Sequence, residues 1–175
     1  MKHFLTAFVF AFSLHTVSET QGLSVIDAYP DNYCAVMDTV SADNLAVCGS
    51  HEGLKALYTN AYNRLVDLAD GGCKQSARQL GEWCSDDNDF TQTDYNVAYS
   101  YFDSSLSAEP VNRDVNTLNT MASLILTCNP FNEEVSAQRQ RASGILKRAL
   151  EICETLKVSV PQILLANLER VKQIS

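Results

Sequence analysis

The segment SHEGLKALYTNAYNRLVDLADGG, residues 50–72, decides the fold class of this chain. Its apolar residues recur at steps of three and four positions, which places them on one face of an α-helix. Ser50 is a preferred helix N-cap and Gly71-Gly72 is a typical stop, so the segment predicts a helix from Ser50 to Asp70. The predicted apolar face consists of Leu54, Leu57, Tyr58, Ala61, Leu65 and Leu68.

The same helical spacing continues along most of the chain, and no segment of useful length alternates as a half-buried strand would. We therefore expect an all-α bundle of about five to seven helices. The helix near 133–157 is expected to begin at an Asn132 N-cap, with two glutamates in its first turn. Further helices are predicted over 73–84, 93–107 and 111–128 and from Ser159, with Pro161 in its first turn, and residues 31–47 could hold one or two short ones.

The first 18 residues, MKHFLTAFVFAFSLHTVS, have the layout of a secretory signal peptide. Lys2 and His3 precede an apolar run over 4–14, which is shorter than the about 20 residues that span a bilayer. Cleavage fits best after Ser18, and a cut after Gly22 is nearly as good. These features predict a secreted, extracellular protein without membrane insertion, in which residues 1–18 are the signal and residues 19–175 form a single helical domain.

Charge and composition exclude two classes of protein. The 175 residues are 46% hydrophobic, which is too apolar for a disordered chain, and a net charge of −8 argues against nucleic-acid binding. From residue 19 to residue 129 there are 16 acids and 5 bases, whereas residues 130–175 have 5 acids and 7 bases. The basic residues Arg139, Arg141, Lys147 and Arg148 could face an acidic partner or form an ordinary solvated helix face.

Six cysteines in a secreted chain predict three disulfides. Cys73 and Cys84 lie eleven residues apart, roughly 16 Å on one continuous helix, so they are too far apart to bond to each other. A break at Gly81 would reopen that pairing. The preferred connectivity is a local Cys34–Cys48 clip, with Cys73 and Cys84 bridging to Cys128 and Cys153 in an order that the sequence leaves open.

Catalytic and cofactor motifs are missing from the sequence. His51 is the only histidine after the signal, and we expect it to be an exposed residue at a helix start. The chain has no G-x-S-x-G elbow, zinc helix, phosphate loop or dinucleotide fingerprint. We therefore expect a protein that is not an enzyme and that holds no cofactor.

An acidic loop, SDDNDFTQTD, is the one plausible metal feature, since oxygen-rich loops bind calcium. An EF-hand register starting at Asp87 would put Gln92 at the turn glycine and Ala98 at the final glutamate. We therefore expect a solvated loop and no metal site. The acids considered are Asp86, Asp87, Asp89 and Asp94.

Tyrosines form two pairs at helical spacing, Tyr58 with Tyr62 and Tyr95 with Tyr99, and Phe102 follows the second pair. Such residues could contact a ligand or a partner, or they could form the edges of a core with their hydroxyls in solvent.

These features favour a secreted helical effector that binds an extracellular protein partner, such as a cytokine-like factor or a venom or salivary component. One alternative is a carrier that holds a small apolar ligand in a pocket between helices. A second alternative is a hydrolase with an acidic or His51-based site.

Overall fold

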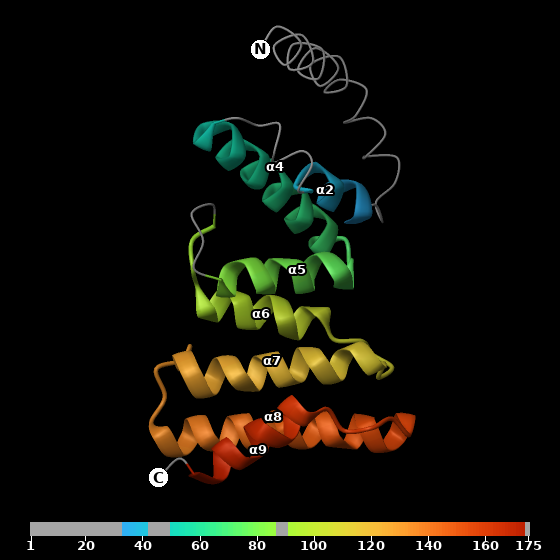
Figure 1. Cartoon of the computed structure of the whole chain (residues 1–175), viewed down its shortest axis with the longest axis vertical. Coiled ribbons are helices and arrows are strands. Elements are labelled where there is room, and N and C mark those ends of the chain that lie inside the picture. The colour runs from blue at the N-terminus through green and yellow to red at the C-terminus, as the bar shows by residue number, and fades with distance from the viewer. Residues whose placement is uncertain (1–32, 42–49, 87–90, 174–175) are drawn as a thin grey trace, which may run out of the picture. The chain divides into compact units, whose positions relative to one another are not determined.

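The computed structural model describes residues 33–41, 50–86 and 91–173. Within those ranges the regular structure consists of seven helices without a strand, which confirms the all-α fold class (Figure 1). None of the helices in these ranges is both long and apolar enough to cross a membrane. The helices are α2 (Tyr33–Thr39), α4 (His51–Asp70), α5 (Lys74–Ser85), α6 (Tyr95–Ser105), α7 (Asn112–Cys128), α8 (Val135–Leu156) and α9 (Gln162–Gln173).

The chain divides into two compact units, residues 1–73 and residues 74–175. In the first unit α2 packs against α4. The Ser50 hydroxyl caps α4 by accepting a 3.1 Å hydrogen bond from the Gly53 amide. At the other end Gly72 has a φ of 93°, a left-handed conformation that glycine adopts without a steric penalty. The predicted start and stop of this helix are both confirmed.

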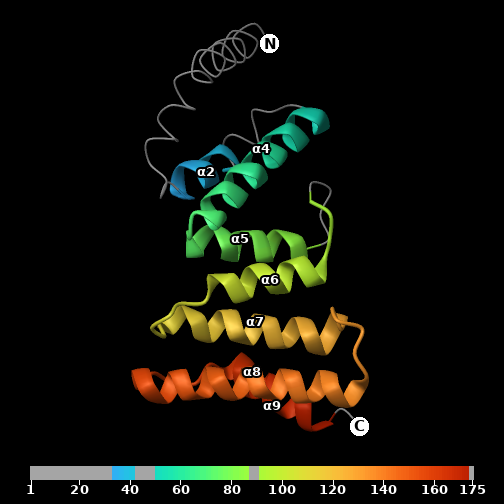
Figure 2. The same cartoon turned by 180° about the vertical axis from the view of Figure 1, so that it is seen from behind.

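In the second unit α5, α6, α7 and α8 are stacked in chain order, and α9 packs on α7 and α8 (Figures 1 and 2). Close packing of α5 on α6 depends on Gly81. A Cβ atom at Gly81 would lie 2.8 Å from the Phe102 ring, which is itself almost completely buried. The α5 helix continues through Gly81 without a break, and Cys73 precedes its first residue, Lys74.

Two described side chains of the polar loop bond to α5 and α6. The Asp94 carboxylate caps α6 by accepting hydrogen bonds of 3.0 Å from the amides of Asn96 and Val97. The Thr91 hydroxyl donates to the Trp83 carbonyl at 2.9 Å. Asp94 therefore has a structural role at a helix N-terminus.

The start of α8 differs from the prediction. Asn132 has a φ of 50°, which is left-handed rather than the extended conformation of an N-cap, and Glu134 occupies the cap position. Asn129 organises this turn, because its side chain accepts from the Glu133 amide and donates to the Glu133 carbonyl. Both glutamates thus precede the helix instead of forming its first turn.

The five described cysteines carry free thiols, so the structure does not support the predicted disulfides. Cys84 lies on α5 and Cys153 on α8, and α6 and α7 separate these two helices in the stack (Figure 1). Cys73 belongs to the first unit, and Cys128 ends α7. Cys34 is exposed on α2, whereas Cys48 lies outside the described residues.

Candidate functional site

The tyrosines predicted as contact residues are distributed over both units. Tyr58 and Tyr62 lie half-buried on α4 of the first unit, whereas the second pair lies on α6 of the second unit. Phe102 is only 1% exposed and fills the space beside Gly81, so its role is in the core. Among the five predicted contact residues, Tyr99 borders a surface hollow together with residues of α8.

Tyr99 belongs to a compact cluster formed by α6, the α7–α8 turn and α8. Its ring meets the Phe131 ring edge to face, with the centroids 4.9 Å apart. The Arg141 guanidinium lies 4.6 Å from the centroid of the same Phe131 ring, within cation–π range. The Arg141 Nε atom also donates to both Glu133 carboxylate oxygens, at 3.0 and 3.1 Å. Phe131 is therefore held between a phenol ring and a paired guanidinium.

The cluster shifts the pKa values of its members. Burial raises the pKa of the Tyr99 phenol, and the nearby Asp103 carboxylate adds to this, while Arg141 opposes it. The hydrogen bond from Arg141 lowers the pKa of the Glu133 carboxyl. At neutral pH the Tyr99 phenol therefore keeps its proton and the Glu133 carboxylate stays charged. The cluster thus combines a neutral phenol with an ion pair between Glu133 and Arg141.

The alternative of a hydrolase with an acidic or His51-based site stays a prediction, because two of the four acids lie outside the described residues. Within the described ranges, no group of three or more His, Cys, Asp or Glu side chains could hold a metal ion. Asp94 caps α6, and Asp86 directly follows α5. Asp87 and Asp89 lie outside the described residues. His51 is the exposed first residue of α4, as expected.

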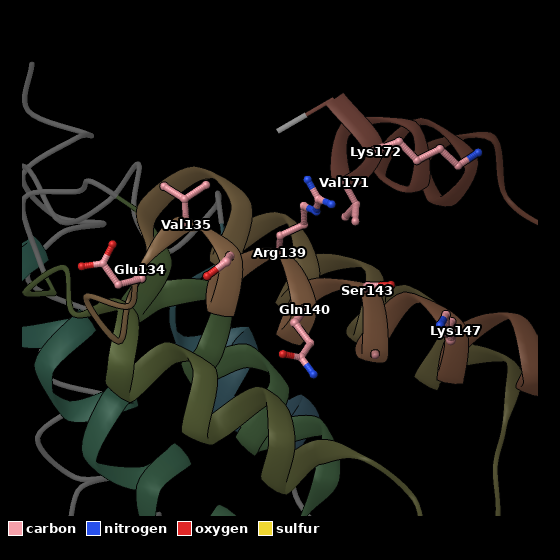
Figure 3. Close-up of a pocket in the computed structure, with 10 residues that line it drawn as sticks. Glu134, Val135, Arg139, Gln140, Ser143, Lys147, Val171 and Lys172 are labelled. Carbon is pink, nitrogen blue, oxygen red and sulfur yellow. The ribbon is translucent and has the colours of Figure 1, made fainter. Parts of the chain in front are cut away.

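A groove of about 910 Å³ lies between α8 and the end of α9 and is here called the α8–α9 groove (Figure 3). Side chains on successive turns of α8 form one wall of the groove, and residues near the end of α9 form the other. In Figure 3 the Arg139 side chain extends from α8 toward Val171 on α9, whereas Gln140 points away from α9. The lining residues are Glu134, Val135, Ser136, Arg139, Gln140, Ser143, Gly144, Lys147, Val171 and Lys172.

Cations dominate the charge of this groove. Arg139 and Lys147 are exposed on α8, and Lys172 is exposed on α9, while Glu134 is the one acid among the lining residues. Lys172 lies 2.7 Å from Glu169, but both side chains are more than half exposed, and such solvent-screened pairs hold weakly. The groove therefore offers positive charge on both of its walls.

Apolar surface lies among these charges. The Val135 side chain is 47% exposed at one end of the groove, whereas Val171 on the α9 wall is only 8% exposed. A Cβ atom at Gly144 would meet nothing within 4 Å, so the surface there is open. The combination of exposed valine, open space and cations suits an amphipathic ligand better than a purely ionic one.

The four basic residues that the sequence grouped into one patch divide between two environments. Arg139 and Lys147 line the α8–α9 groove, Arg141 joins the Tyr99 cluster, and Arg148 is exposed outside both. Sequence reasoning missed Val171 and Lys172, which belong to another helix. The basic last turn of α9 was the available signal, but its neighbour in space could not be read from the sequence.

Comparisons with protein-family models, with curated proteins and with solved structures find no match to this chain. Its function is therefore argued from the groove itself.

Proposed function

We propose that the protein is a secreted helical effector that binds an extracellular protein partner through the α8–α9 groove. The observation that carries the proposal is the predominantly cationic charge of this groove beside the exposed Val135 side chain. Protein interfaces combine an apolar contact area with a polar rim, and Arg is enriched in them.

The groove is favoured over the tyrosine pairs as the contact surface. The hollow beside Tyr99 has a volume of about 490 Å³ and is bordered by the charged side chains of Glu133 and Arg141. A carrier of a small apolar ligand needs a site with few charges, because burying charges beside an apolar ligand is costly. We therefore place partner binding above ligand transport.

Secretion forms the other half of the proposal and rests on the signal-like sequence MKHFLTAFVFAFSLHTVS. The disulfides predicted from the six cysteines form no part of it, because the five described cysteines carry free thiols.

A photo-crosslinking experiment tests partner binding. A photoreactive benzoylphenylalanine replaces Ser136, an exposed residue of the groove, and in a matched control it replaces Thr120, an exposed residue of α7. We expect irradiation in extracellular fluid of the source tissue to join a discrete protein to the Ser136 variant, and Arg139→Glu to abolish this product. Equal products from both positions, or none from Ser136, would refute the groove as the contact surface.

Mass measurement of the protein recovered from culture medium tests secretion. The expected chain begins at Glu19 or at Leu23, after removal of the signal. A chain that stays in the cell and retains Met1 would overturn the secretion half of the proposal.

A further inference from the structure

We infer that the α8–α9 groove accepts an acidic amphipathic helix of the partner protein. This inference rests on the proposed function and goes further by stating the chemistry and geometry of the segment that binds.

The positions of the cations define where the partner must carry carboxylates. Arg139 and Lys147 are eight residues apart on α8, which corresponds to about 12 Å along the helix axis. Carboxylates seven or eight residues apart on a facing helix have nearly the same separation, so they can reach both cations together. Lys172 on α9 adds a third cation on the opposite wall. A helix that lies in the groove therefore meets positive charge on both sides.

The space between the cations suits apolar side chains. The surface above the exposed Gly144 is open, with nothing within 4 Å of its Cβ position, so leucine-sized side chains can lie there without displacing protein atoms. Val135 continues the apolar surface toward the start of α8. A helix with one apolar stripe flanked by acids satisfies this pattern, and docking of such a stripe into a groove is a common mode of peptide recognition.

Glu134 makes the groove asymmetric along its length. It stands at the end of the groove where α8 begins, whereas Lys147 lies about three and a half turns further along α8. A bound helix whose acids face Arg139 and Lys147 would place a basic residue against Glu134. The groove therefore favours one of the two possible directions of the bound helix, since the reverse direction brings like charges together.

Peptide binding to the full mature chain tests the inference directly. The probe is a fluorescent helical peptide of about 20 residues with one leucine stripe, flanking glutamates seven or eight positions apart and a lysine near one end. Two comparison peptides have every glutamate replaced by glutamine, or the lysine moved to the other end. Binding is followed by fluorescence anisotropy at low and at high salt.

Charge reversal on α8 supplies the matched variants. Arg139→Glu and Lys147→Glu alter the groove, whereas Arg148→Glu makes the same change in net charge on the same helix outside the groove. All three side chains are exposed, and circular dichroism and thermal unfolding of each variant establish that it folds like the parent chain before binding is compared. We expect each groove variant to weaken binding of the acidic peptide by about tenfold or more, and Arg148→Glu to change it less than about threefold.

Several results would overturn the inference. The glutamine peptide could bind as tightly, Arg148→Glu could weaken binding as much as the groove variants, or the two lysine placements could bind alike. Tighter, Arg139-dependent binding of a heparin oligosaccharide or of phosphatidylserine vesicles would assign the groove to a different class of ligand. If the Ser136 crosslink forms but the acidic peptide does not bind, the partner chemistry is wrong while the proposed function stands. If neither occurs, both fail.

Discussion

The side-chain amide of Asn167 on α9 donates a 3.0 Å hydrogen bond to the side-chain carbonyl of Asn119 on α7, and both residues are buried. This bond fixes the rotation of α9 against the α7–α8 pair, because a rotated α9 would leave two amides in the core without partners. It therefore determines which residues of α9 form the wall of the groove.

Removal of one partner of this pair should destabilise the second unit. We expect Asn167→Ala to lower the free energy of unfolding by about 1–3 kcal/mol, since the Asn119 amide stays buried without its donor. Urea unfolding measures the change, and Asn116→Ala, at an exposed position of α7, is the control. An equally small effect of both substitutions would show that the bond contributes nothing to stability.

A methyl group at Gly81 should push α5 away from α6. The added Cβ would lie 2.8 Å from the Phe102 ring, so we expect Gly81→Ala to cost about 1–3 kcal/mol of stability despite the better helix propensity of alanine. Thermal unfolding monitors the loss. Combination with Phe102→Leu should recover part of it, and a stable Gly81→Ala variant would contradict the close contact.

The same substitution at Gly144 should have the opposite sign. Gly144 lies within α8 with open space around its Cβ position, so we expect Gly144→Ala to stabilise the chain by about 0.5–1 kcal/mol. Chemical unfolding provides the number. A destabilised Gly144→Ala variant would mean that another part of the chain occupies this space.

The ion pair between Glu133 and Arg141 should make stability depend on pH. Arg141 lowers the pKa of Glu133 in the folded protein, so the pair stabilises the fold above the ordinary glutamate pKa, and this contribution disappears as the pH falls through the lowered value. We expect the melting-temperature difference between the parent chain and Arg141→Gln to be larger near pH 7 than below pH about 2. A difference that stays constant with pH would contradict this electrostatic origin. In an NMR titration the Glu133 pKa should return toward its ordinary value in Arg141→Gln.

The thiols should react at rates that follow their burial. Exposed Cys34 should alkylate first in the native protein, while buried Cys84 and Cys153 should react only on unfolding. Timed alkylation with peptide mapping follows each site. A denatured, unreduced chain that takes up fewer than six alkyl groups would reveal a disulfide and contradict the free thiols of the structure.

Local patterns in the sequence predicted the helices well. The steps of three and four residues over 50–70 depend on contacts one turn apart, and the Ser50 cap and Gly72 stop act within a few residues. The prediction that Asn132 caps α8 was wrong. Asn129, an asparagine three positions earlier, organises this turn through its side chain. Two candidates of one residue type at the same helix start cannot be ranked from their identity alone.

The lining of the groove and the separation of the cysteines could not be predicted from local patterns, because both depend on contacts between residues far apart in the sequence. Val171 and Lys172 meet Arg139 only because α9 folds back on α8, and the Asn119–Asn167 bond that sets this contact joins residues 48 positions apart. An even number of cysteines likewise carries no spatial information, and the stacking order of α5 to α8 separates Cys84 from Cys153.

Gln140 and Gly144 border both the α8–α9 groove and the hollow beside Tyr99. Two ligands on the exposed side of α8 would therefore compete for the same strip of helix surface, and saturation with one should raise the apparent dissociation constant of the other. Substitutions at Gln140 or Gly144 report on both hollows together, whereas Arg139 and Tyr99 each report on one.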